Sequence, residues 1–196
     1  MYTWIDKRNF GFTLLEVLVV VVIVSILATV GVPMYYSQLR NSERAAAQSQ
    51  MLQLAADLER WRGKNFSYQG FTPTNGLSYA TSTSQTMFLP AGSNSSSSKY
   101  MITLVDSADR TLSLVPTALP SSVGQNWTMI ARPNSGDLTD TAASKGYMGS
   151  ASRLVLDSRG VRCMTPGTFS DHIQDSVIAV MTTSDAGLCG NSSKSW

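Results

Sequence analysis

The sequence predicts an α+β fold, in which one long N-terminal helix packs on an antiparallel β-sheet. An apolar run over residues 12–32 is followed by apolar residues at helical spacing. Short runs rich in Val, Ile, Leu, Thr and aromatic residues come next, separated by turn residues. A helix followed by a series of strands is typical of an α+β domain with an antiparallel sheet.

The apolar run is long enough to cross a membrane as a helix. Its 21 residues contain one charge, Glu16, and would span about 31 Å, whereas strands rarely exceed about ten residues. The basic flank with Lys7 and Arg8 should stay cytoplasmic, which sends the rest of the chain across the membrane. Gly31-Val32-Pro33 is a poor cleavage site for a secretory signal.

Glu16 is an unusual residue for a lipid-embedded helix. A carboxylate there costs a few kcal/mol and indicates a functional site. If the chain is cut after Gly11, Phe12 becomes a cationic amine four residues before Glu16 and on the same helical face, and the positive end of the helix also favours an acid. The alternative is a protonated Glu16 near the interface without a function.

The segment Gly11-Phe12-Thr13-Leu14-Leu15-Glu16, with its basic leader and apolar helix, resembles the class III signal of type IV pilins and related pseudopilins. The resemblance implies that residues 1–11 are a cleaved leader. It implies that a prepilin peptidase cuts between Gly11 and Phe12 and methylates the amine of Phe12. It also implies that Glu16 pairs with an N-terminal amine as subunits enter the filament.

Pro33 lies where many pilins carry a helix-kinking proline, and its missing amide hydrogen predicts a kink or local loosening. The helix is expected to continue over residues 33–63 and to end at Gly63. Its polar face includes Arg60 and Lys64. The apolar face, expected to pack on the sheet, consists of Met51, Leu54, Ala55, Leu58 and Trp61.

Residues 64–196 are expected to form a sheet domain outside the membrane. The Ser-, Thr-, Gly- and Asn-rich segment from Asn65 to Lys99 predicts a connecting loop in which only residues 87–89 are available for burial. The expected strands are Tyr100–Val105, Thr111–Val115, Trp127–Arg132, Arg153–Asp157 and Val177–Thr182. Their pairing cannot be deduced from the sequence.

Cys163 and Cys189 are the two cysteines of the chain, and they suggest one disulfide in an oxidising compartment. The alternative is two separate buried thiols. By resemblance to pilins, the two would bound a C-terminal disulfide loop of about 27 residues. With His172 as the single histidine, a zinc site is poorly supported, and we expect no metal or other cofactor.

The chain carries none of the sequence motifs of nucleotide-binding or hydrolytic enzymes, and we expect no catalysis. His172, between Asp171 and Asp175, is interpreted as a surface residue. DNA binding ranks below a structural role, because residues 64–196 carry nine Lys or Arg against eight Asp or Glu, which predicts weak binding. The basic residues considered for a DNA-binding stripe are Arg132, Lys145, Arg153, Arg159 and Arg162.

Residues 127–132 followed by residues 154–160 also resemble the ectodomain of PilE-like minor pilins. The resemblance implies a structural subunit of a type IV pilus, a minor pilin in pilus assembly or initiation, with motility, adhesion or DNA uptake downstream. The alternatives are a major pilin, a type II secretion pseudopilin, and a DNA-binding receptor pilin for competence. Expected partners are other pilin subunits, the prepilin peptidase and the inner-membrane assembly machinery. The subunit should cross the inner membrane once, with its C-terminus periplasmic, and then move into the pilus.

Overall fold

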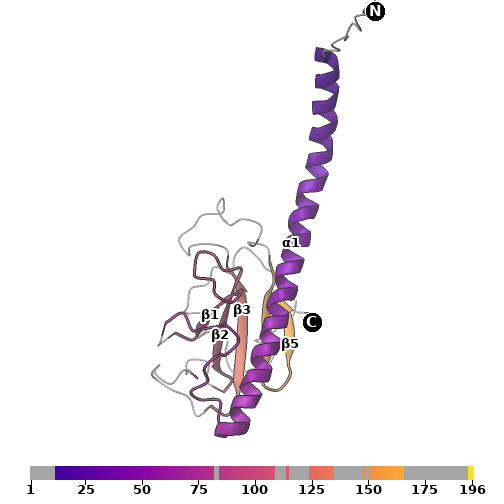
Figure 1. Ribbon diagram of the computed structural model, residues 1–196. Coiled ribbons are helices and arrows are strands. Elements are labelled where there is room, and N and C mark those ends of the chain that lie inside the picture. The colour runs from indigo at the N-terminus through magenta and orange to yellow at the C-terminus, as the bar shows by residue number, and fades with distance from the viewer. Residues whose placement is uncertain are drawn as a thin grey trace, which may run out of the picture. The chain divides into compact units, whose positions relative to one another are not determined.

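The computed structural model describes residues 12–81, 84–108, 114, 124–134, 148, 151–165 and 194–196. One helix precedes a five-stranded sheet (Figure 1). The elements are α1 (Leu14–Asn65), β1 (Thr86–Leu89), β2 (Tyr100–Asp106), β3 (Trp127–Pro133), β4 (Arg153–Asp157) and β5 (Arg162–Thr165). Neighbouring strands are consecutive in the chain and antiparallel, in the order β1-β2-β3-β4-β5. The expected α+β class is confirmed.

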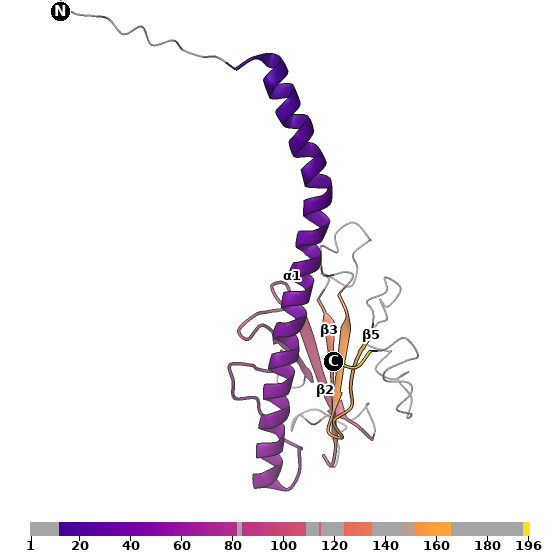
Figure 2. The ribbon, with the colours of Figure 1, turned by 90° about the vertical axis from the view of Figure 1, so that its right-hand side faces the viewer.

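The chain divides into two compact units, residues 1–39 and 40–196. In the first unit, the described residues are the start of α1, and every one of them up to Gln38 is exposed. In the second unit, the remainder of α1 covers one face of the sheet (Figure 2). The hydrophobic core therefore belongs to the second unit alone.

The core forms where the predicted apolar face of α1 meets one face of the sheet. Met51 and Leu58 are fully buried and Leu54 is 1% exposed. Alternate residues of each strand point to one face, so the strands contribute every second side chain to this layer. The strand residues that complete the core cluster are Met87, Leu89, Tyr100, Ile102, Leu104, Trp127, Met129, Ala131, Leu154 and Leu156.

Strands β2, β3 and β4 lie where the sequence predicts them, but β1 and β5 were missed. β1 lies within the segment interpreted as a loop, and its four residues pair along their whole length with β2. β5 is also four residues long and pairs with β4. Short edge strands of this kind depend on a partner strand, which a local sequence pattern does not reveal.

Two other predicted strands fall largely or wholly outside the described residues. These are Thr111–Val115, of which only Leu114 is described, and Val177–Thr182. Leu114 is buried in the core and lies in a bend. Its carbonyl accepts a hydrogen bond from the amide of Gly70 at 2.8 Å.

The helix ends at Asn65, so the prediction that Gly63 ends it is wrong. Phe66 takes the left-handed conformation that terminates the helix, with φ of 59°, a position at which glycine is favoured. Its amide donates to the carbonyl of Arg62 at 2.8 Å. The helix therefore continues through the glycine and terminates at an aromatic residue, at a conformational cost of about 1 kcal/mol.

The chain after Phe66 is held by a close approach between two segments. The amide of Tyr68 donates to the carbonyl of Gly124 at 2.8 Å. Gly124 has φ of 69°, and a Cβ there would lie 2.5 Å from the amide nitrogen of Gln69. Only a glycine fits this position without displacing the backbone beside it.

Candidate functional site

The start of α1 carries the residues that the sequence singles out for assembly. The amide of Glu16 donates to Thr13 Oγ1 at 3.2 Å, and the amide of Val17 donates to the Thr13 carbonyl at 3.3 Å. Thr13 is therefore the N-cap, and Glu16 is in the first turn at the third helical position. The positive end of the helix dipole favours an acid there. Phe12 directly precedes the cap and is 82% exposed, while Gly11 lies outside the described residues.

The apolar half of α1 is long and apolar enough to cross a membrane, and none of its most apolar stretch is buried within the chain. Its hydroxyl groups bond to their own helix: Ser25 Oγ donates to the Val21 carbonyl and Thr29 Oγ1 to the Ile26 carbonyl, each at 2.7 Å. These hydroxyls need no water, so the surface of the stretch suits an apolar environment. Pro33 lies inside α1, which continues on both sides of it; the expected kink or loosening stays a prediction.

The first expected disulfide residue is bonded in the structure. Cys163 is disulfide-bonded, while Cys189 lies outside the described residues together with Asp171, His172 and Asp175. The end of the chain packs beside Cys163, because Lys194 and Met164 exchange two backbone hydrogen bonds of 2.7 and 2.9 Å. Trp196 Nε1 donates to the Cys163 carbonyl at 3.0 Å. These contacts fasten the last residues to the edge of β5.

The arginines that are close in sequence do not form one patch. Arg153 begins β4, across from Thr165, whereas Arg159 is in the turn at the other end of β4. Arg162 lies across from Leu156, so strand alternation places it on the opposite face from Arg153.

The strand register instead brings Arg153 close to Arg132. Ala131 of β3 pairs with Leu154 of β4, and Arg132 and Arg153 are the next residues beyond this pair. The amide of Asn134 donates to the Lys99 carbonyl, which puts Lys99 at this same end of the sheet. Lys145 lies outside the described residues.

Acidic side chains of the sheet domain are mostly withdrawn from its described surface. Asp57, Asp106 and Asp157 are 6%, 5% and 1% exposed. Asp157 organises the β4–β5 turn: Oδ2 accepts from Arg159 Nη2 at 2.7 Å and Nε at 3.0 Å, and Oδ1 accepts from the amides of Arg159 and Val161 at 3.0 Å. Asp57 pairs with Arg60 at 2.7 Å and accepts a hydrogen bond from Asn75.

Most described cations of this domain remain at the surface. In residues 64–196, over which the formal charge is nearly balanced, the structure describes two of the eight acids, Asp106 and Asp157, and both are buried. Among the residues from Arg40 onward that the structure describes, the two acids that are not buried are Glu43 and Glu59.

A further basic segment went unnoticed in the sequence. Residues 60–66, Arg-Trp-Arg-Gly-Lys-Asn-Phe, combine three cations and two aromatics with no acid. We call this segment the helix tip. The helical pattern assigns Arg60 and Lys64 to the polar face of a helix, but cations that alternate with aromatic residues are also a signal for nucleic-acid contact.

One hydrogen-bonded cluster fixes the helix tip to the sheet. Glu59 Oε1 accepts from Tyr68 Oη at 2.8 Å and from Trp127 Nε1 at 3.3 Å. Arg62 Nη1 donates to Tyr68 Oη at 3.1 Å, and its guanidinium lies 5.2 Å from the centre of the tyrosine ring. Burial and the hydrogen bond to Glu59 raise the pKa of Tyr68, which therefore stays a neutral donor. The tip is thus held in one place.

Metal chemistry finds no support in the part of the chain that the structure describes. Those residues include no group of three or more His, Cys, Asp or Glu side chains that could hold a metal ion.

Two family models match the chain. Residues 33–141, more than half of it, match the family described as type IV minor pilin ComP, DNA uptake sequence receptor. Residues 6–32 match the prokaryotic N-terminal methylation motif. No curated protein and no solved structure matches the chain.

Proposed function

Because the chain belongs to the family of the type IV minor pilin ComP, we propose that it is the subunit of a type IV pilus that binds DNA for uptake. It is a minor pilin, a structural subunit that its apolar helix anchors in the membrane and that assembles with other pilins. The match favours this role over the alternatives of major pilin and secretion pseudopilin. The observation that carries the proposal is the family match over residues 33–141, which span the second part of α1 and much of the sheet domain.

Maturation begins with removal of residues 1–11 by a prepilin peptidase, which cuts between Gly11 and Phe12 and methylates the new amine. Support comes from the methylation motif over residues 6–32 and from the cap at Thr13. The cap starts the helix directly after Phe12 and keeps Glu16 in its first turn. The new amine of an incoming subunit then pairs with the carboxylate of Glu16 in a filament whose core excludes water.

The sheet domain lies on the periplasmic side of the inner membrane before assembly and on the pilus afterwards. The basic residues Lys7 and Arg8 precede the apolar helix and favour this orientation. The disulfide at Cys163 is also consistent with an oxidising compartment. A receptor for extracellular DNA has to be displayed in this way.

The main contribution to the affinity of the sheet domain for DNA would be electrostatic. Duplex DNA attracts cations that neutralise its phosphates and release counterions. The expectation of weak binding rested on formal charges alone, but three of the five acids that the structure describes from Arg40 onward are buried, and one of them, Asp157, accepts two hydrogen bonds from the Arg159 guanidinium. The described surface of this domain therefore presents more cationic than anionic side chains.

The test is a titration of duplex DNA with the full mature chain in non-ionic detergent, at several salt concentrations. We expect binding that weakens by about tenfold or more between 50 and 200 mM salt. A sample unfolded by reducing the disulfide and adding urea is the control for non-specific attraction to a weakly basic chain. Absence of binding at 50 mM salt would exclude the receptor role and leave a minor pilin that acts in assembly alone.

A further inference from the structure

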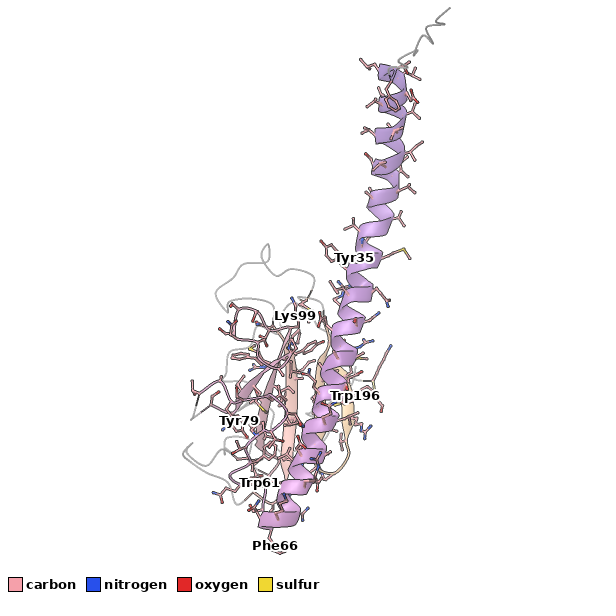
Figure 3. The ribbon with its side chains drawn as sticks, in the orientation of Figure 1. Tyr35, Trp61, Phe66, Tyr79, Lys99 and Trp196 are labelled. Atoms are coloured by element: carbon pink, nitrogen blue, oxygen red, sulfur yellow. The ribbon has the colours of Figure 1, made fainter. Side chains whose placement is uncertain are left out.

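Phe66 stands out from the other apolar side chains of the sheet domain. It is 86% exposed, and among the described residues from Arg40 onward the only other exposed large apolar residue is Leu52, at 39%. Figure 3 shows it at the end of α1, directed away from the sheet. Its φ of 59° is one that a bulky side chain rarely adopts. Phe66 thus combines an exposed ring with an unfavourable backbone conformation.

Neither feature is required by the fold. The turn needs a residue that tolerates the left-handed conformation, which glycine and asparagine do better than phenylalanine. The hydrogen bond from the Phe66 amide to the Arg62 carbonyl is a backbone contact that any such residue would keep. The ring contributes nothing to the core, since the buried aromatic residues here are Tyr68 and Phe71, each 1% exposed.

The position of the backbone that carries the ring is nevertheless well defined. On the N-terminal side of Phe66, α1 ends with the hydrogen bond from the Phe66 amide to the Arg62 carbonyl. On the C-terminal side, Tyr68 is buried and donates hydrogen bonds to Gly124 and Glu59. A backbone segment held between two anchored points loses little further entropy when its side chain meets a partner. This is the arrangement expected of a contact residue.

The surroundings indicate the chemistry of that partner. Arg60 has a side chain that is 71% exposed, and Arg62 and Lys64 are exposed. Cations in the last turn also offset the helix dipole, but the dipole does not explain an exposed aromatic beside them. Of the two acids that precede these cations in the helix, Asp57 pairs with Arg60 at 2.7 Å and Glu59 is engaged by Tyr68 and Trp127, so neither pairs with Lys64. A lone aromatic ring among cations suits nucleic acid, whereas a contact with another protein would favour a wider apolar patch.

We propose that the helix tip is a DNA contact, in which Phe66 packs against sugars or base edges of duplex DNA while Lys64 binds its phosphates. The inference rests on the proposed function, since it names the part of the protein that touches the DNA. Phosphate contacts position a protein on DNA, and apolar contacts such as that with the thymine methyl group read the base edges. Phe66 therefore contributes to affinity without contributing to salt dependence, and Lys64 contributes to both.

The test compares Phe66→Gly, Phe66→Asn and Lys64→Gln in the full mature chain in non-ionic detergent, by anisotropy of a labelled duplex. Both Phe66 variants should weaken binding about fivefold or more and leave the slope of log affinity against log salt unchanged. Lys64→Gln should weaken binding and reduce that slope by about one. Neither Phe66 variant should lower Tm, because both new residues tolerate the left-handed turn. Leu52→Ala, at the other exposed large apolar residue that the structure describes from Arg40 onward, should bind as the wild type does.

The outcomes separate the two proposals. A wild-type chain that does not bind DNA overturns the receptor role and the helix tip together. A wild-type chain that binds, with Phe66→Gly and Phe66→Asn binding equally well, overturns the helix tip alone. Unchanged DNA binding together with loss of both variants from sheared filaments would assign Phe66 to a contact with another pilin subunit instead.

Discussion

Leucines in the two halves of α1 have opposite environments: Leu18 is 58% exposed, while Leu54 and Leu58 are 1% and 0% exposed. Both halves are apolar, but among the described residues only those of the second half pack on the sheet. Burial of one leucine contributes about 1.5–3 kcal/mol, so burial of the first half would contribute a large free energy. The membrane buries this half first, and neighbouring subunits bury it later. The first half of the helix is therefore an assembly element, whereas the second half is part of a folded domain.

The largest expected effect in the first half comes from Glu16→Ala. The variant should insert in the membrane at least as stably as the wild type and should still be cut after Gly11. In the filament it leaves an unpaired ammonium in an apolar core, at a cost of several kcal/mol, so we expect a depletion from filaments of at least about tenfold. The measurement is a blot of membrane and sheared-filament fractions from cells that express only the variant.

Ser25→Ala is the matched control for Glu16→Ala. It removes a polar side chain from the same apolar stretch, but one that bonds to the Val21 carbonyl of its own helix. It should enter filaments normally. Undiminished Glu16→Ala in the filament fraction would leave Glu16 without a role in assembly.

The next prediction compares the same leucine-to-alanine substitution in the two halves of α1. Leu54→Ala should lower the free energy of unfolding of the sheet domain by about 3 kcal/mol, because it opens a cavity in the core. Leu18→Ala should change it by less than about 0.5 kcal/mol, because Leu18 is exposed and lies outside the described core. Urea unfolding of the mature chain in non-ionic detergent, followed by tryptophan fluorescence, measures both; of Trp61, Trp127 and Trp196, Trp127 is buried in the core. Equal losses would contradict the division of α1 into two roles.

A smaller effect tests the contact that holds the chain after the helix tip. Gly124 and Gly92 both have positive φ, of 69° and 80°, but a Cβ at Gly92 would meet nothing within 4 Å. Gly92→Ala should cost about 1 kcal/mol through its backbone conformation alone. Gly124→Ala should cost at least about 1 kcal/mol more, because its Cβ would collide with the amide of Gln69. The same urea unfolding measures both, and equal costs would show that the close approach is not needed.

Sequence alone was sufficient for the long elements. The apolar run and the stripe through Met51 and Leu58 predicted both halves of α1, and β-branched runs predicted the bounds of β2, β3 and β4 to within a residue. Four-residue β1 and β5 were missed because their stability comes from pairing. The end of the helix was misplaced because Phe66 adopts a conformation that sequence preference assigns to glycine.

The candidate site was predicted unevenly for a similar reason. Phe12, Glu16 and the basic leader belong to a local motif, which a sequence displays directly. Surface charge depends on burial and register instead: the hairpin separates Arg153 from Arg159 and Arg162, and burial removes Asp157 from the surface. Such relations appear only when the strands are paired.

The most direct measurement of the central claim is the accessibility of the first half of α1 within sheared filaments, where no bilayer remains to protect it. Leu18→Cys and Ser95→Cys, the latter at an exposed loop residue, would be treated with a water-soluble maleimide before and after dissociation in detergent. We expect Ser95→Cys to react in both states and Leu18→Cys to react only after dissociation, because other subunits cover it in the filament. Equal reaction of the two cysteines in intact filaments would contradict the assignment of this half to assembly.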